Sequence, residues 1–349
     1  MNSNKKISRK IFLALTSNVF VTFFGFVSLF FVKRFMGYEA LGIFAFAFAY
    51  VSLFKILGDL GFSMSHVKRV NEGKDLGKCN GTIISIKVFL TIIMGLSALL
   101  FFQLQKFLGI QFDSNIVEIS IYLFIILIMI ININTGFRSI FTAKKEIAKN
   151  RLPRFIGRFL IMIFKISVAI SGFSVIYLIG AEIIGSILIL LFYIYLLRNE
   201  PIKKPDMEYF KNYRDFALPV VFIGITLTFM NHIDKVMIGH FTTSLDVGYY
   251  YLAQRLTEVF VMFSISISMV FFPYLSGFVK NSQFEKIRIL TSKAERYMCL
   301  FLFPLIISLF ILAEPFLALT FGSDTVNSVS VFRILLLAIH NQKRSKFIL

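Results

Sequence analysis

The chain has 349 residues, of which 57% are apolar and only 16% are charged, and its formal net charge is +18. Disorder is excluded because it needs low hydrophobicity, and two cysteines far apart in the sequence exclude a disulfide scaffold. These few charged residues cannot form the water-facing surface of a soluble protein of this size. The composition therefore indicates a protein that crosses a membrane many times.

Ten apolar segments follow one another along the chain; they are continuous, as in transmembrane helices, and do not alternate as barrel strands do. The first six are residues 11–32, 40–60, 82–102, 116–137, 155–173 and 175–197. The other four are residues 216–241, 247–274, 297–312 and 331–340, the last being about half the usual length. The predicted fold class is an all-α polytopic membrane protein.

Basic residues are unequally divided between the two sides of the predicted bundle. Of the 37 Lys and Arg, 28 fall in the tails and loops on the side of the N-terminus, and three fall in the loops opposite. Loops rich in Lys and Arg stay in the cytoplasm, so we expect a cytoplasmic-membrane protein with its N-terminus inside the cell. The asymmetry explains the positive charge without a nucleic-acid partner, and membrane lipids are expected partners of the basic loop at residues 138–158.

The sequence carries no motif for bond-breaking chemistry. It has no G-x-x-x-x-G-K-[ST] loop, no H-E-x-x-H pair and no Cys or His cluster with metal-site spacing. Short outer loops disfavour a membrane glycosyltransferase. We expect no enzyme activity, no cofactor and no metal. Gly73, Gly77 and Gly81 recur every four residues, but in a charged loop, where we do not expect a motif that packs spans.

Charged residues inside the spans are the candidate functional residues, because a lipid-facing charge at the bilayer centre costs roughly 2.5–3.5 kcal/mol. The strongest signal is Asn231-His-Ile-Asp-Lys, four polar residues in five positions of the seventh span. Lys55 and Asp59 lie four residues apart, on one face of the second span. Arg255 and Glu258 lie three residues apart in the eighth span. Each pair is read either as a functional site or as a structural ion pair.

Three further charges are isolated in their spans: Lys87, Lys165 and Glu182. The two lysines indicate a cationic interior in the first six spans, although each can also snorkel or pair structurally. Asn132 and Asn134, in the fourth span, are expected to form hydrogen bonds between helices.

A weak internal repeat links two junctions between spans. Glycine and aromatic positions of the first junction recur 206 residues later, matching Gly42, Phe44 and Ala47 with Gly248, Tyr250 and Ala253. Both junctions lie on the outer side, so the repeat is parallel and predicts two lobes. These are a six-span N-terminal lobe (residues 1–199), a cytoplasmic linker (200–215) and a partial C-terminal lobe of about four spans (216–349).

Several stretches are similar to those of a known carrier family: residues 37–50, Gly58-Asp-Leu-Gly-Phe, Asp234-Lys-Val-Met-Ile-Gly, residues 247–256 and residues 315–339. On these stretches the chain resembles the polysaccharide (O-antigen type) flippases of the multidrug/oligosaccharidyl-lipid/polysaccharide exporter superfamily. Members of that family have more spans, so the resemblance implies a C-terminally truncated member.

The resemblance implies that undecaprenyl-pyrophosphate-linked oligosaccharide (an O-antigen, capsule or exopolysaccharide unit) is moved to the outer leaflet by ion-coupled alternating access. Candidate contacts for the substrate in the lumen are then the basic residues of the spans: Arg255, Lys235, Lys87, Lys165 and Lys55. Candidates for ion coupling, or for holding those cations, are the acidic residues Asp234, Asp59, Glu182 and Glu258. Polysaccharide polymerase machinery is an implied partner. Two alternatives stay open, a multidrug exporter of the same superfamily and a truncated remnant without transport activity.

Overall fold

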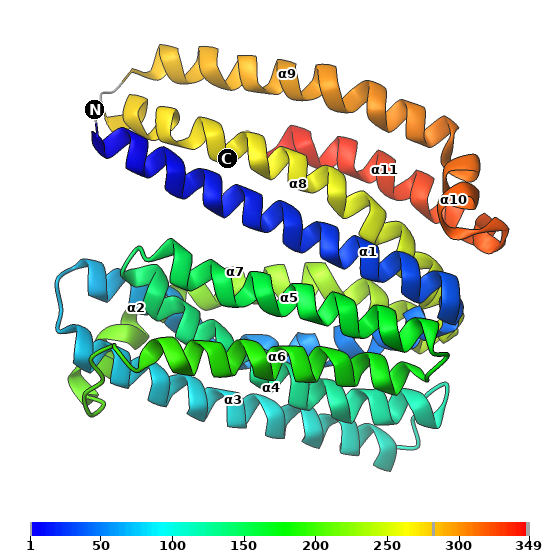
Figure 1. Cartoon of the computed structure of the whole chain (residues 1–349), viewed down its shortest axis with the longest axis horizontal. Helices are drawn as coiled ribbons and strands as arrows, with labels where there is room; N and C mark the ends of the chain where they lie inside the picture. The colour runs from blue at the N-terminus through cyan, green and yellow to red at the C-terminus, as the bar shows by residue number, and fades with distance from the viewer. Residues whose placement is uncertain (1, 281–282, 347–349) are drawn as a thin grey trace. The chain divides into compact units, whose positions relative to one another are not determined.

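A computed structural model of the chain describes residues 2–280 and 283–346, and these residues are almost entirely helical, without a strand (Figure 1). In chain order, the elements are α1 (Asn2–Ser52), the 3-10 helix η1 (Leu53–Gly58), α2 (Phe62–Asn71), α3 (Leu76–Phe107), α4 (Asn115–Ala143), α5 (Ile147–Ile170), α6 (Val175–Leu197), α7 (Met207–Phe241), α8 (Ser244–Lys280), α9 (Phe284–Ile311), α10 (Ala313–Phe321), the 3-10 helix η2 (Ser323–Thr325) and α11 (Val326–Lys346).

Six segments of the described chain are long and apolar enough to cross a membrane. They are Thr16–Gly58, Leu76–Phe107, Asn115–Ala143, Val175–Leu197, Met207–Phe241 and Phe284–Ile311. The first contains most of the first two predicted spans, and most of the predicted fifth span lies in α5. The predicted eighth and tenth spans lie in α8 and α11, where many side chains fall outside the described residues. The prediction of an all-α, multi-pass membrane protein is confirmed.

The first two predicted spans are separated by a single glycine. Gly37, with φ 79° and ψ −173°, interrupts the helical backbone of α1. A positive φ of this kind favours glycine, because a side chain would collide with the backbone. The predicted break between the spans that end at residue 32 and begin at residue 40 is thus a change of backbone conformation at Gly37 alone.

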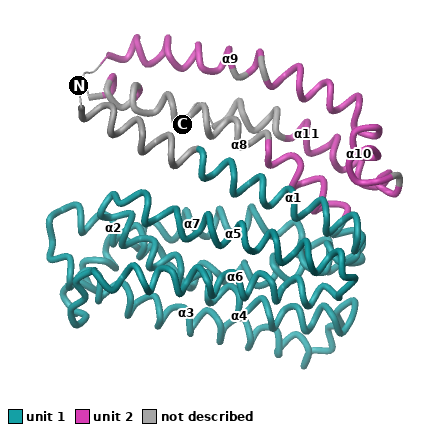
Figure 2. The backbone as a smooth tube through the Cα atoms, viewed as in Figure 1, with its two compact units in different colours: residues 1–248 teal, residues 249–349 magenta. Residues whose placement is uncertain are grey.

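The chain forms two compact units, residues 1–248 and residues 249–349 (Figure 2). In the first unit, α3 packs on α4, α4 and α5 pack on α6, and α1 packs on α5 and α4. Its core also includes Tyr213 and Ala217 of α7, and all of α7 lies within this unit. In the second unit, α9, α10 and α11 pack on one another. The lobe boundaries predicted from the repeat stay a prediction.

Two glycines of the sequence repeat contact the opposite junction. A Cβ atom added to Gly42 would lie 1.6 Å from the backbone oxygen of Ser244 and 2.9 Å from the backbone nitrogen of Gly248. A Cβ atom added to Gly248 would lie 2.1 Å from the backbone oxygen of Tyr38. Asp113 holds the start of α8 in this contact, because its Oδ2 accepts a 2.9 Å hydrogen bond from the backbone nitrogen of Ser244, the first residue of that helix. The repeat positions therefore meet in a close backbone contact.

The predicted linker is bound along the beginning of α3. The backbone nitrogen of Lys203 donates to the oxygen of Gly77 at 3.0 Å, and Asn80 Nδ2 donates to the oxygen of Pro201 at 2.9 Å. A Cβ atom on Gly81 would lie 1.8 Å from the oxygen of Lys203. Gly77 and Gly81 were predicted to lie in a loop, but they lie in the first turns of α3. Their small size lets the linker, and not another span, pack closely on that helix.

The start of α7 is held by the short helix α2. Tyr213 is fully buried, and its hydroxyl lies 3.0 Å from Nδ1 of His66, which is also buried. Ser65 Oγ donates to the backbone oxygen of Tyr213 at 3.0 Å. Burial lowers the pKa of His66 from 6.5 to about 4, because the apolar surroundings disfavour the protonated imidazole. The neutral histidine is therefore a structural part of this contact.

Candidate functional site

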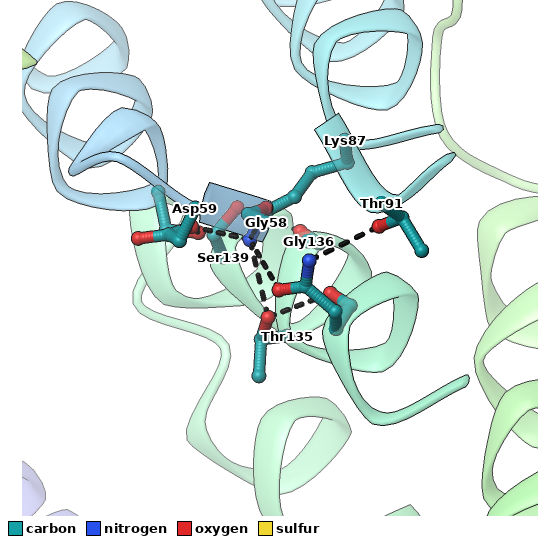
Figure 3. A network of polar contacts seen from close by, with 9 residues as sticks. Gly58, Asp59, Lys87, Thr91, Thr135, Gly136 and Ser139 are labelled. Atoms are coloured by element: carbon teal, nitrogen blue, oxygen red, sulfur yellow. Dashed lines mark hydrogen bonds and ion pairs between the residues drawn. The ribbon is translucent and has the colours of Figure 1, made fainter. Parts of the chain in front are cut away.

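Lys87 of α3 lies at the centre of a buried polar network (Figure 3). Its side chain is 2% exposed, and its Nζ forms an ion pair with Asp59, at the end of η1. The same Nζ donates to Asn132 Oδ1 at 3.3 Å and to Thr135 Oγ1 at 3.2 Å, both on α4, and to the oxygen of Gly58 at 3.4 Å. Every proton of the ammonium group thus has an acceptor, as a buried charge requires.

The network joins η1, α3 and α4, and a separate bond joins α4 to α6. Asn132 Nδ2 donates to Thr91 Oγ1 at 3.1 Å, which links α4 to α3. Further along α4, Asn134 Nδ2 donates to the oxygen of Ser186 at 3.0 Å, which links α4 to α6. The prediction that both asparagines bond between helices is confirmed.

Asp59 does not pair with the lysine that the sequence indicates. The expected pair, Lys55 with Asp59, needs α-helical geometry across residues 55–59. Residues 53–58 instead form a 3-10 helix, and Asp59 leaves it with φ −125°, so the carboxylate turns to Lys87. The expected shared face is wrong for this reason. Among the described side chains, no carboxylate lies within ion-pair distance of Lys55.

Glu182 of α6 joins two cations of α5. Its Oε1 lies 2.6 Å from Nζ of Lys165, and its Oε2 lies 3.2 Å from a terminal nitrogen of Arg158. The Lys165 ammonium also lies 4.2 Å from the ring centroid of Phe44, in α1. Lys165 and Glu182 are isolated in the sequence but paired in the fold. Arg158 was missed because it was counted as a cytoplasmic anchor.

The polar run of α7 forms its own ion pair. Lys235 Nζ lies 2.8 Å from Asp234 Oδ1 and donates to the oxygen of Asn231 at 2.8 Å, with only 5% of the lysine side chain exposed. The neighbouring His232 ring makes an edge contact with Phe48 of α1, 5.7 Å between centroids. The run is therefore packed on the second half of α1.

In the second unit, Arg255 and Glu258 of α8 form the pair that the sequence predicts. Their closest nitrogen and oxygen atoms are 2.6 Å apart, and both side chains are more than one-third exposed. The guanidinium of Arg255 lies 4.9 Å from the ring centroid of Tyr251. Each of the four candidate acids thus pairs with one of the candidate cations, and Lys55 is the remaining one. No group of three or more metal-binding side chains occurs in the described residues.

A family model described as "Polysaccharide biosynthesis protein" matches residues 31–330 of the chain. The probable low-salt glycan biosynthesis flippase Agl15 of Haloferax volcanii is 24% identical over 325 residues, which are 91% of this chain and 65% of that protein. The probable flippase AglR of the same organism is 25% identical over 287 residues, 81% of this chain and 58% of that protein. The chain thus spans about three-fifths of the length of these two relatives.

Two solved structures show the same fold at low sequence identity. The lipid II flippase MurJ, in an inward closed conformation, has a TM-score of 0.73 at 16% identity, covering 93% of this chain and 72% of MurJ. An inward-facing multidrug resistance MATE family transporter has a TM-score of 0.67 at 16% identity, covering 90% of this chain and 76% of the transporter. The chain therefore has the helical-bundle fold of these two carriers.

Proposed function

We propose, from the premise that the chain belongs to the polysaccharide biosynthesis protein family, that it is a flippase for a lipid-linked oligosaccharide. The observation that carries the proposal is the family match across residues 31–330, which includes every ion pair of the candidate site. The substrate that fits best is an oligosaccharide on undecaprenyl pyrophosphate, such as an O-antigen, capsule or exopolysaccharide unit, moved from the cytoplasmic to the outer leaflet.

The chemistry of such a substrate explains why charges lie among apolar helices. Sugar hydroxyls and a pyrophosphate cannot enter hydrocarbon without losing their hydration. A hydrated lumen with cations lowers that barrier, while the polyprenyl tail stays in the lipid. We assign the lumen contacts to Lys55, Lys165, Lys235 and Arg255. Lys87 joins them only when its network opens, because its ammonium is saturated with acceptors.

Ion coupling is assigned to the paired carboxylates. Each charge moved through 100 mV supplies about 2.3 kcal/mol, which can drive a conformational change. Asp234 is the first choice, because it lies in the densest polar run of a membrane helix and holds Lys235. Neutralising the carboxylate by a proton or an ion would release that lysine for the substrate. Asp59, Glu182 and Glu258 hold cations in the same way.

A multidrug exporter is the second candidate, favoured by the likeness to the MATE transporter. The excess of cations over acids in the candidate site favours an anionic substrate instead. The two candidates are separated by placing the purified protein in liposomes that contain fluorescent undecaprenyl-diphosphate oligosaccharide or, in a second set, a cationic dye. We expect the glycan to cross and the dye to stay. Dye transport without glycan movement would overturn the proposal.

The same preparation tests the lumen residues. Replacing Arg255 or Lys235 by alanine is expected to abolish glycan movement while the protein remains in the membrane. Arg255→Lys should restore part of the activity if charge matters more than the fork geometry of arginine. Normal movement in both alanine variants would leave these residues with a structural role alone.

We place the protein in the cytoplasmic membrane with its N-terminus inside, and a polysaccharide polymerase is a proposed partner. The basis for the orientation is the unequal distribution of Lys and Arg. Cysteines are introduced one at a time in a Cys299→Ser background, in which the remaining Cys79 is buried. An impermeant reagent added outside is expected to label positions 113 and 246, and not positions 149 or 286. Labelling at position 149 would reverse the orientation.

A further inference from the structure

One face of α5 carries a row of cations, of which the proposed lumen contacts include only the last, Lys165. Arg151, Arg154, Arg158 and Lys165 follow at intervals of three, four and seven residues, so their side chains leave the helix on the same side. At 1.5 Å per residue, the row extends for about 21 Å. It begins in the predicted cytoplasmic loop and ends at the Lys165–Glu182 pair in the membrane.

The arginines of this row lie close to one another and to cations from neighbouring helices. Arg154 is within electrostatic range of Arg138, Arg151 and Arg158. The start of α5 is also bonded to α4 beside Arg138, because Asn150 Nδ2 donates to the backbone oxygen of Arg138 at 3.3 Å. We call the four arginines at positions 138, 151, 154 and 158 the arginine cluster. It brings cations of α4 and α5 together at the inner side of the first unit.

Counter-charges for the arginine cluster are few. Arg158 shares Glu182 with Lys165, and Arg151 donates to Asn18 Oδ1 at 2.6 Å. Among the side chains that the structure describes, no carboxylate lies within ion-pair distance of Arg138 or Arg154. The four guanidinium groups of the arginine cluster and the ammonium of Lys165 therefore share one carboxylate, that of Glu182.

Topology anchoring alone does not explain this arrangement. Lys144 and Lys149 lie in the same predicted loop and serve equally well as positive charges on the cytoplasmic side. Both are neutralised, since Lys144 lies 2.7 Å from the buried Glu200 and Lys149 lies 2.9 Å from Glu146. Positive charges that only fix the topology need neither to share a helix face nor to lack counter-charges. The arginine cluster has both features, which suit a ligand with several negative charges.

We propose that the arginine cluster binds the diphosphate of a lipid-linked substrate at the cytoplasmic end of α5, before the substrate reaches Lys165. This inference rests on the proposed function and adds a binding site to it. Arginine suits the site because its planar fork binds phosphate oxygens in pairs and it stays charged when partly buried. A diphosphate carries enough oxygens for more than one fork, whereas a phospholipid headgroup offers a single phosphate.

The test measures binding by the full chain in neutral-lipid nanodiscs, with labelled undecaprenyl diphosphate as the probe. Competitors are inorganic pyrophosphate and, in separate discs, phosphatidylglycerol. We expect Arg154→Gln to weaken binding about tenfold or more, because it removes a charge-assisted contact. The matched control is Lys149→Gln, which removes the same charge five residues earlier in α5, at a side chain that is 39% exposed and already paired with Glu146. It should change binding less than twofold.

Several outcomes would overturn the inference. Equal weakening in the Arg154 and Lys149 variants would reduce the site to general charge, and competition by phosphatidylglycerol as strong as by pyrophosphate would make it an anionic-lipid contact. Arg154→Lys, which keeps the charge, checks that lost binding is not lost folding. Failure of the proposed function is distinguishable: the chain would then bind the diphosphate without moving the glycan. Failure of the inference alone would show as transport and binding that Arg154→Gln leaves unchanged.

Discussion

The pair between Lys87 and Asp59 should be one of the costliest polar contacts to break in the first unit. Lys87→Met keeps the length of the side chain but removes the ammonium, leaving the Asp59 carboxylate and the acceptors on Asn132 and Thr135 unpaired. Breaking a buried pair costs about 3–5 kcal/mol. Asp59 is 33% exposed and can regain water, so we expect about 2–3 kcal/mol for Lys87→Met.

Asp59→Asn should cost at least as much, about 3–5 kcal/mol, because it leaves a nearly fully buried ammonium without a counter-charge. The double variant should then be destabilised by about 2 kcal/mol less than the sum of the single changes. A matched control is Lys106→Met on the same helix, which breaks an exposed pair with Glu118 and should cost less than about 1 kcal/mol.

The measurement uses the cysteines of the chain. Cys79 is buried and Cys299 is exposed, so in a Cys299→Ser background a thiol-reactive dye fluoresces only when the first unit unfolds. Lys87→Met should lower the midpoint of thermal unfolding in detergent by about 5–10 °C. Additive losses in the double variant, or equal losses for the Lys87 and Lys106 variants, would refute the account of the network.

Three other outcomes are expected. Gly81→Ala should destabilise the chain by about 2 kcal/mol, because the added Cβ would collide with the backbone oxygen of Lys203. Gly180→Ala, whose Cβ would point into open space on α6, should be neutral or stabilising in the same thermal assay. Equal effects of the two changes would contradict the packing of the linker on α3. The pKa of His66 is about 4 in the folded chain and 6.5 when unfolded, so between pH 4 and 6.5 the unfolded state binds more protons. The free energy of unfolding should therefore fall by up to about 3 kcal/mol as the pH drops from 6.5 toward 4. An unchanged pH slope in His66→Gln would exclude this cause. Asp234→Asn should abolish glycan accumulation driven by a proton or sodium gradient in liposomes, and unchanged gradient dependence would move the coupling role to another carboxylate.

Hydropathy predicts the positions of the spans because membrane insertion depends mainly on local apolar content. The break at Gly37 and the pairing of Arg255 with Glu258 are also local, since both depend on residues within one turn. The contact of Lys165 with Glu182 could not be predicted, because it depends on which helices become neighbours. Distance along the chain carries no information about that choice.

Two other differences have separate physical reasons. The face shared by Lys55 and Asp59 was predicted from α-helical periodicity, and a switch to 3-10 geometry at residues 53–58 rotates the carboxylate toward another helix. Arg158 was assigned to the cytoplasmic loop because the rule for basic loops counts charges and ignores the direction in which they point. The three- and four-residue spacing along α5 was the signal that could have identified it.

The contact between Gly42 and Gly248 has an evolutionary consequence. If the two junctions descend from one duplicated segment, the ancestral glycine would have met its own copy, so a single mutation would have produced two collisions at once. In one chain the two positions are separate targets for mutation, but each is limited by the backbone of the opposite junction. Neither can gain a side chain first without a steric clash. Drift should therefore erase the surrounding similarity between the halves before it erases these two glycines.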